Sequence, residues 1–260
     1  MREPLVLKSK LITCPHAFST RVGGVSTGLY ESLNLSCNQP GDEPELVREN
    51  WRLFGQAAGI DTSRFVHAKQ VHENYVHIAR PEDACGILDH GGLQADGHIT
   101  DIPGLPLAVF TADCTPLLLH EPVRGIAAAI HCGWRSTMAD IEGEAMKKLT
   151  AMGGEAKNVR AAIGPCIRSC CFQVGPEVAQ AAQALLGEEA SQAFYRPDPS
   201  ADGKLLLDLA GVVRCRLLQL GVPAEQIEII GECTMCHPER YWSHRRTGLA
   251  RGSQASIIML

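Results

Sequence analysis

The sequence predicts a protein of the α+β or mixed α/β class that contains a mixed β-sheet. Two observations support this class. Several apolar runs are short and are bounded by Gly, Pro or Asp, as buried strands are. Segments with helical periodicity lie between and after these runs, so that strands and helices alternate along the chain.

The expected strands are five short segments in the middle and later parts of the chain. They are LAVF at 107–110, PLLLH at 116–120, GIAAAIH at 125–131, VRAAIG at 159–164 and QIEIIGECT at 226–234. The first four are apolar almost throughout, which is typical of strands whose two faces are both covered.

Four segments have the periodicity of helices. Residues 43–60 space apolar side chains on one face and carry Gly59 after the expected end. Residues 136–154 form an apolar stripe, with Thr137 and Asp140 in the arrangement of a capping box. Two further helices are expected at 176–187 and at 208–221. Asp208 is the expected cap of the last of them.

Length and composition are those of a folded globular protein. The chain has 260 residues, of which 45% are hydrophobic and 20% charged, enough apolar content to form a sizeable core. No repeat, low-complexity tract or linker divides it, so one domain spanning 1–260 is expected. No heptad or long apolar edge is evident, and a monomer is expected.

Charge and hydropathy exclude some partners. The net charge of −5 provides no basic field for a phosphate backbone, so nucleic acid is not an expected partner. The apolar runs are too short to span a membrane, and the first twenty residues lack the apolar core of a signal peptide. A cytoplasmic location is expected, in which most of the eleven cysteines would be free thiols.

Three residues combine reactive chemistry with positions at the ends of strand-like segments. They are His72 in KQVHENYV, Cys114 in TADCTP and His131 in AIHCGW. Two histidines and a cysteine can fill three positions of a zinc tetrahedron and leave the fourth open, as catalytic zinc sites do. Asp113 and Asp96 are candidates to orient a ligand or to move a proton.

The same residues permit other interpretations. Cys114 paired with His131 or His72 can act as a thiolate nucleophile. The segment CTMCH contains Cys233 and Cys236 as a CxxC pair, which alone is weak support for a structural zinc site, and CIRSCC at 166–171 would have to supply partners. We do not predict a site there from the sequence.

The segment HCGWRST also has the features of an anion site. A helix that begins just after Gly133 points free backbone N–H groups toward the region of His131, and Arg135 adds a positive charge. Phosphate or a carboxylate would suit such a place.

Seven ordered segments resemble one protein family. They are FSTRVGGVSTGLYESLNLS, KQVH, ADGHIT, TADCTPLLL, HCGWRST, IGPCI and CTMC with YWSHRR, and they extend from about Phe18 over nearly the whole chain. This series resembles the YfiH family, also called the laccase-like multicopper polyphenol oxidase domain. The resemblance implies mixed β-sheets packed together and flanked by helices, in a fold related to cysteine hydrolases.

The resemblance also implies an activity and a ligand set. The family's zinc ligands fall on His72, Cys114 and His131, and Arg21 becomes a candidate contact to substrate or phosphate together with Arg135. The implied enzyme is a zinc-dependent purine nucleoside phosphorylase with adenosine deaminase activity. Its substrates would be phosphate and adenosine, inosine, guanosine or methylthioadenosine. Cys114, His131 and Asp113 would be the catalytic residues.

Two other functions are attached to the same resemblance. One is copper-dependent oxidation of polyphenols, with copper in place of zinc. The other is a cysteine-dependent hydrolase or editing factor that acts on peptidoglycan precursors. The chain also departs from the family's usual HAGWRG, since it carries Cys132 and Ser136. Cys132 is adjacent to His131 and is a candidate for a competing thiolate, but we expect it to be a bystander.

Overall fold

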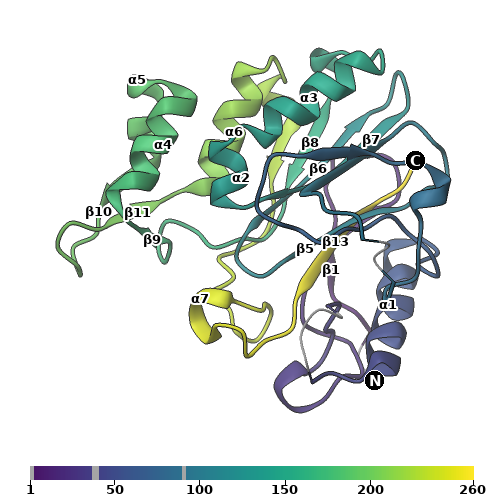
Figure 1. The fold of residues 1–260 in the computed structure, drawn as a ribbon. Helices are drawn as coiled ribbons and strands as arrows, with labels where there is room; N and C mark the ends of the chain where they lie inside the picture. Colours follow the sequence, from purple (N-terminus) through teal and green to yellow (C-terminus); the bar gives the residue numbers. More distant parts are fainter. Residues whose placement is uncertain (1–2, 37–40, 90–91) are drawn as a thin grey trace.

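Four layers form the body of the protein. The computed structural model describes residues 3–36, 41–89 and 92–260. A four-stranded sheet packs against a six-stranded sheet, helix α1 covers the outer face of the smaller sheet, and helices α3 and α6 cover the outer face of the larger one (Figure 1). The expected class of packed mixed sheets flanked by helices is confirmed.

The six-stranded sheet contains both parallel and antiparallel neighbours. Its strands, in order across the sheet, are β12 (Ile227–Ile229), β8 (Arg160–Ile163), β6 (Thr115–Glu121), β7 (Ile126–Cys132), β4 (Gly97–Thr100) and β3 (Val76–Ile78). On β6, Leu117 and Leu119 face the helices whereas Leu118 faces the other sheet. Both faces are therefore buried, which explains the uninterrupted apolar runs; each buried Leu contributes roughly 2 kcal/mol of burial free energy.

The four-stranded sheet is antiparallel and joins distant parts of the chain. Its order is β1 (Val6–Leu7), β2 (His16–Ser19), β13 (Gln254–Ile258) and β5 (Leu107–Thr111). The strand that ends near the C-terminus thus lies beside one from the N-terminal region. Since β5 belongs to this sheet and β6 to the other, residues 112–114 form the crossover between the two sheets.

The helices of the body follow the predicted segments with two exceptions, since one predicted segment contains two helices and the short helix at His244–Thr247 was not predicted. They are α1 (Pro44–Ala58), α2 (Trp134–Met138), α3 (Ile141–Ala151), α6 (Leu209–Gln219) and α7 (His244–Thr247). Asp208 caps α6 by accepting from the backbone N–H of Gly211, as expected. Short 3-10 turns occur at η1 (Gly28–Tyr30), η2 (Pro81–Asp83), η3 (Ala156–Asn158), η4 (Gln192–Phe194) and η5 (Ala224–Gln226).

The helix predicted over 136–154 is in fact two helices. Asp140 adopts a left-handed conformation with φ of 64° and caps α3 through the backbone N–H of Gly143. Its carboxylate also pairs with Arg216 of α6. Thr137 donates to Glu142 instead of forming the expected capping box with Asp140. The helix that begins after Gly133 is consequently only five residues long.

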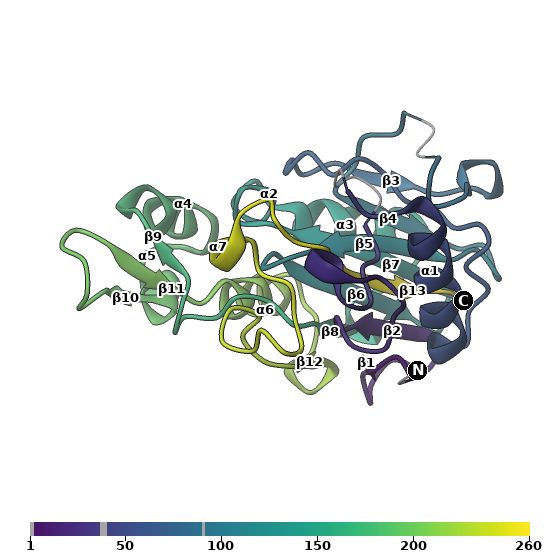
Figure 2. The same cartoon turned by 90° about the horizontal axis from the view of Figure 1, so that it is seen from below.

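A smaller lobe projects from one end of the body (Figures 1 and 2). It consists of β9 (Gln173–Val174), α4 (Pro176–Leu186), α5 (Glu188–Ser191), β10 (Tyr195–Pro197) and β11 (Leu205–Leu207). Its own apolar cluster includes Phe172 and Leu207 and extends onto α6. Within the described residues, no helix combines the length and apolar character needed to cross a bilayer.

Candidate metal centre

The structure brings His72, Cys114 and His131 together from three separate segments. His72 lies in the loop before β3, Cys114 in the crossover from β5 to β6, and His131 near the end of β7. Their candidate ligand atoms all lie within 4.8 Å of one another, and Cys114 Sγ is 3.9 Å from His72 Nε2. In a tetrahedral zinc site such atoms are about 3.3–3.8 Å apart, so small side-chain movements suffice to bind the ion.

Asp96 organises two of the three residues. This buried carboxylate accepts from His131 Nδ1 at 2.8 Å and from the backbone N–H of His72 at 3.0 Å. It also accepts from the N–H groups of Val71 and Glu73. Burial alone raises the pKa of Asp96, but the bond and charge of His131 and the backbone donors outweigh it and lower this pKa. With Nδ1 engaged, His131 presents Nε2 to the site.

The backbone at the site is held in unusual conformations. His72 has φ of 62° and Asp113 has φ of 88°, in the left-handed region that non-glycine residues rarely adopt. Such a residue costs on the order of 1 kcal/mol, which surrounding contacts must offset. The three N–H groups that bind Asp96 supply those contacts for the loop of His72.

Cys114 and His131 form an electrostatically coupled pair. Burial raises the pKa of the Cys114 thiol, but the charge of His131 and hydrogen bonds from both histidines overcome it and lower this pKa to about 6. Burial likewise lowers the pKa of His131, while the Cys114 sulfur and Asp96 raise it to about 9. A sulfur that ionises readily is the form that binds a metal and the form that acts as a nucleophile.

Gly133 provides a geometric test of whether the three residues fit a metal ion. A Cβ atom at this position would lie 2.9 Å from His72 Cδ2, 3.4 Å from His131 Cε1 and 3.6 Å from Cys114 Sγ. The absence of a side chain therefore leaves space that all three residues face. Together with a donor set of two imidazoles and one thiolate, this space fits a zinc ion, and these residues also suit copper.

The three residues open into a cavity of about 880 Å³. Its walls include the aromatic rings of Phe110, Trp134 and Phe172. Arg135, which was predicted from the sequence, lines this cavity and stacks over Trp134 with its guanidinium carbon 4.3 Å from the ring centroid. A large cavity with aromatic walls and charged groups at one end is typical of small-molecule sites.

Arg21 lies outside the residues that line the cavity. Its guanidinium donates to the backbone oxygens of Glu31 and Pro238, the latter at 2.9 Å, and stacks over Trp242. The Arg21 side chain therefore links the loop of Glu31 to the loop of Pro238. The contact of Arg21 with substrate or phosphate stays a prediction.

Asp113 lines the cavity, and both oxygens of its carboxylate accept hydrogen bonds from later parts of the chain. It accepts from Thr234 Oγ1 at 2.6 Å, from Ser243 Oγ at 3.0 Å and from the backbone N–H of Arg245 at 2.6 Å. The bonds from Ser243 and Arg245 attach the start of α7 to the crossover that carries Cys114, and the bond from Thr234 attaches the turn between Cys233 and Cys236. His244 and Arg245 of α7 thereby reach the cavity.

Arg251 is a cavity residue that the sequence did not single out. It donates to Gly252 O and Ser253 Oγ, both at 3.0 Å, while its buried Nε has no hydrogen-bond partner among the described residues. Burial lowers its pKa, and the nearby Asp113 and Cys114 oppose that effect. Sequence patterns did not identify Arg251 as a functional residue, because an arginine between small residues in a loop has no distinctive pattern.

Cys132 does not compete for the metal. It is fully buried on the face of β7 opposite His131, packed among the side chains beneath α3. Burial and the neighbouring Glu142 raise its pKa well above the usual range. Cys132 is therefore a bystander to the three residues, as expected from the sequence, since alternate residues of a strand point to opposite faces.

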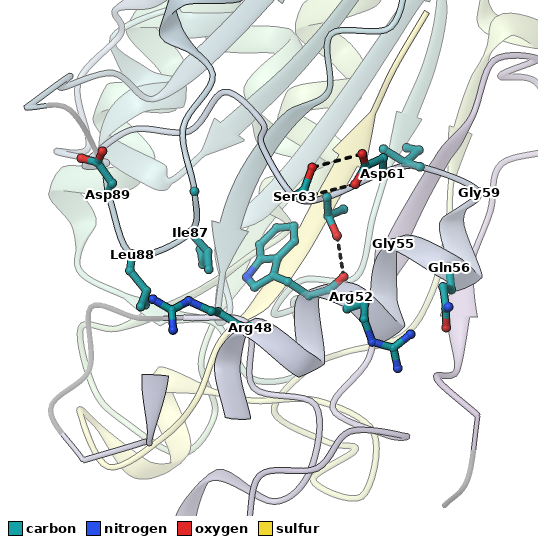
Figure 3. Close-up of a pocket in the computed structure, with 14 residues that line it drawn as sticks. Arg48, Arg52, Gly55, Gln56, Gly59, Asp61, Ser63, Ile87, Leu88 and Asp89 are labelled. Atoms are coloured by element: carbon teal, nitrogen blue, oxygen red, sulfur yellow. Dashed lines mark hydrogen bonds between the residues drawn. The ribbon is translucent and has the colours of Figure 1, made fainter. Parts of the chain in front are cut away.

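A second cavity, of about 570 Å³, lies along α1 and contains different chemistry (Figure 3). Arg48 and Arg52 face it from α1, each paired with a glutamate three residues earlier. Asp61 is bonded to Ser63. The described residues that line this cavity include no histidine or cysteine, so the reactive groups belong to the first cavity.

Comparison with known proteins gives consistent matches over nearly the full chain. Residues 15–260 match the family described as multi-copper polyphenol oxidoreductase laccase. A purine nucleoside phosphorylase of Deinococcus radiodurans is 34% identical, with 98% of this chain and 92% of the relative covered. Another from Bacteroides thetaiotaomicron is 34% identical and covers 94% and 91%. The crystal structure of the Bacillus licheniformis protein YfiH superposes with a TM-score of 0.86 at 30% identity, covering 94% and 92%.

Proposed function

The chain belongs to the multi-copper polyphenol oxidoreductase laccase family, and we propose that it is a zinc-dependent purine nucleoside phosphorylase. The substrates are phosphate and adenosine, inosine, guanosine or methylthioadenosine. A second proposed activity is deamination of adenosine to inosine. The observation that carries the proposal is the convergence of His72, Cys114 and His131 on a cavity with aromatic walls and arginines, in a chain whose relatives are named purine nucleoside phosphorylases.

Binding of the two substrates follows from the cavity's lining. Trp134 and Phe172 offer flat apolar surfaces on which a purine can stack. Arg251 and Arg135 offer guanidinium groups suited to the oxygens of phosphate. Asp113 acts as a positioning residue, because its bonds to Ser243 and Arg245 hold the start of α7 against the cavity.

In phosphorolysis, a phosphate oxygen forms a bond to the anomeric carbon of ribose as the glycosidic C–N bond breaks. The electron pair of that bond leaves with the purine, which takes up a proton, and the products are the free base and ribose 1-phosphate. His72, Cys114 and His131 would hold the zinc ion, which when bound supplies a Lewis acid at this end of the cavity. The arginines keep the phosphate in place and neutralise its charge until it reacts.

In deamination, water adds to the amino-bearing carbon of adenine and ammonia leaves, which gives inosine. Both reactions place a purine nucleoside beside the same three residues. Asp96 fixes the protonation and orientation of His131 in either case, because its oxygen is bonded to Nδ1.

The test is to incubate the purified, zinc-loaded protein with adenosine in the presence and absence of phosphate. Adenine and ribose 1-phosphate, formed only with phosphate, identify phosphorolysis. Inosine, formed without phosphate, identifies deamination. The Cys114→Ala variant should lose the zinc ion held by His72, Cys114 and His131, and both activities with it. A zinc-loaded protein that turns over none of the four nucleosides would refute the proposal.

Copper-dependent oxidation of phenols is the second candidate, supported by the family's description. A laccase uses several copper centres, whereas the described residues contain one cluster with histidines, at His72, Cys114 and His131, and a second made of cysteines alone. We therefore rank it lower. Oxygen consumption with a phenolic substrate after loading with copper, absent in the Cys114→Ala variant, would favour it.

A cysteine-dependent hydrolase or editing factor for peptidoglycan precursors rests on the lowered pKa of Cys114 beside His131. Under this alternative, metal removal by a chelator would leave the hydrolysis of an amide-bearing substrate intact, and alkylation of Cys114 would abolish it.

A further inference from the structure

Four cysteines form a second cluster, away from the three residues described above. Cys170 and Cys171 lie in the segment between β8 and β9, whereas Cys233 and Cys236 lie between β12 and α7. Their sulfur atoms all lie within 4.8 Å of one another. The separation is 3.3 Å between Cys171 and Cys236 and 3.6 Å between Cys170 and Cys236. Two segments some sixty residues apart in the sequence thus each contribute two sulfur atoms to the same cluster.

We propose that Cys170, Cys171, Cys233 and Cys236 bind a zinc ion as a tetrathiolate site. Four sulfurs at the Zn–S distance of about 2.3 Å lie about 3.8 Å apart, close to the separations in the structure. Both pairs come from loops, and a CxxC turn is a usual source of two zinc ligands. Four thiolates and no histidine leave no open position, so the site is structural rather than catalytic.

The cluster lies at the edge of the apolar core of the smaller lobe, where Cys233 is buried and Cys171 packs against that core. Cys170 and Cys236 are exposed and Cys171 is half-buried, so that burial of apolar thiols does not account for the cluster. The backbone N–H of Arg168 points to Cys233 Sγ at 3.4 Å, and such N–H groups stabilise a metal-bound thiolate.

A positive charge accompanies the CxxC turn. The guanidinium of Arg246 donates to the backbone oxygens of Thr234 and Met235, at 3.2 and 2.9 Å, which are the two residues between Cys233 and Cys236. A zinc ion with four thiolates carries a net charge of about −2, and an arginine at this place offsets part of it.

A zinc ion bound to the four cysteines would stabilise one wall of the cavity that Cys114 lines. Thr234, next to Cys233, donates to the Asp113 carboxylate, and the N–H of Ile167 donates to the Asp113 backbone oxygen at 2.9 Å. The N–H of Thr234 also donates to Cys166 O at 3.1 Å. A tetrathiolate site at 170–171 and 233–236 would therefore restrain both of the segments that hydrogen-bond to Asp113, the residue before Cys114.

The test is the zinc content of purified variants, measured by elemental analysis. We expect about two zinc ions per chain in the unaltered protein, about one in Cys236→Ser and about one in Cys114→Ala. Cys215→Ser, which removes a half-buried thiol of α6 outside both clusters, should keep about two. If the first site holds no zinc, the unaltered protein binds about one, and Cys236→Ser, not Cys114→Ala, loses it. Equal zinc in Cys236→Ser and the unaltered protein overturns the proposal.

Alkylation of the unaltered protein gives a second readout that needs no variant. Cys170 and Cys236 are exposed, so a maleimide should label them rapidly after zinc is removed by a chelator and at least tenfold more slowly after zinc is restored. Peptide mass analysis identifies the labelled residues. Equal labelling in both states, or disulfides between these cysteines in the freshly purified protein, overturns the proposal.

Discussion

Asp96 and His131 are joined by a hydrogen bond of 2.8 Å between Oδ1 and Nδ1, inside a buried part of the site. The same carboxylate binds the backbone N–H of His72. One acidic side chain therefore sets the ring orientation of one candidate ligand and the backbone conformation of another. The three-residue cluster depends on a residue that itself contacts no metal.

Replacing Asp96 with Asn should weaken zinc binding about 10–100-fold, because outer partners of metal-bound histidines contribute this much to affinity. The amide of Asn has the size of the carboxylate but lacks its negative charge. That charge favours the form of His131 that presents Nε2 to the site. Competition with a chelator of known affinity measures the change. Asp101→Asn, at an exposed ion pair with Arg80, is the matched control and should leave the affinity unchanged. Equal affinities for D96N and D101N would contradict the role of Asp96.

Replacing Gly133 with Ala should abolish zinc binding at the first site without unfolding the protein. The backbone of Gly133, with φ of −67° and ψ of 158°, is one that alanine adopts freely. The added Cβ would lie 2.9 Å from His72 Cδ2 and displace that ring. Zinc content and the thermal unfolding midpoint should be measured together.

The control for this change is Gly86→Ala, where a Cβ has no neighbour within 4 Å. It should keep both the zinc and the unfolding midpoint. If Gly133→Ala retains its full zinc content, the metal does not bind in the space that His72, Cys114 and His131 face.

Replacing Arg251 with Gln should raise the KM for phosphate more than tenfold while the KM for nucleoside changes little. The reason is that the half-buried guanidinium of Arg251 lines the cavity and pairs with no carboxylate among the described residues, and a charge-assisted bond to phosphate contributes about 1.5–3 kcal/mol. Steady-state kinetics with varied phosphate provide the measurement. Arg52→Gln, an exposed residue of α1 beside the second cavity, is the control. A parallel rise in both KM values would point to a general loss of structure instead.

The central strands and three ligand candidates could be predicted from the sequence because their signals are local. Strands β5 to β8 are covered on both faces, so their residues are apolar almost without interruption. His131 and Cys114 stand out because each follows such a run. Their pattern alone did not single out a metal site; the family resemblance did.

The remaining features depend on contacts between distant residues, which local patterns do not reveal. Asp140 divides a predicted helix because its carboxylate meets Arg216 of α6. Asp113 resembled a proton carrier next to Cys114, yet its partners Thr234 and Ser243 come from more than a hundred residues later. The four-cysteine cluster is not predicted for the same reason: the sequence offers CIRSCC as a source of partners for the CxxC pair, but it does not show that the fold places the two segments side by side.

Glu142 should make the protein's stability fall as the pH rises from 5 to 8. This carboxyl group is fully buried on α3, with Oε1 bonded to Thr137 and Oε2 without a partner among the described residues. Burial raises its pKa from 4.5 to about 7, against the opposing effect of its own backbone N–H and of the hydrogen bond from Thr137. Since the folded state holds this proton more tightly than the unfolded state, the stabilisation is complete below pH 4.5 and is lost as the pH passes 7.

The Glu142→Gln variant removes this titration. Relative to the unaltered protein, it should gain up to about 3 kcal/mol in free energy of unfolding at pH 8 but less than about 1 kcal/mol at pH 5. Urea unfolding at pH 5, 6, 7 and 8, with equal zinc loading, measures the difference. Glu144→Gln, a more exposed carboxyl on the same helix, should show no such divergence. Curves for Glu142→Gln and the unaltered protein that stay parallel from pH 5 to 8 would mean that Glu142 ionises in the folded protein as easily as in the unfolded chain, and that its burial carries no electrostatic cost.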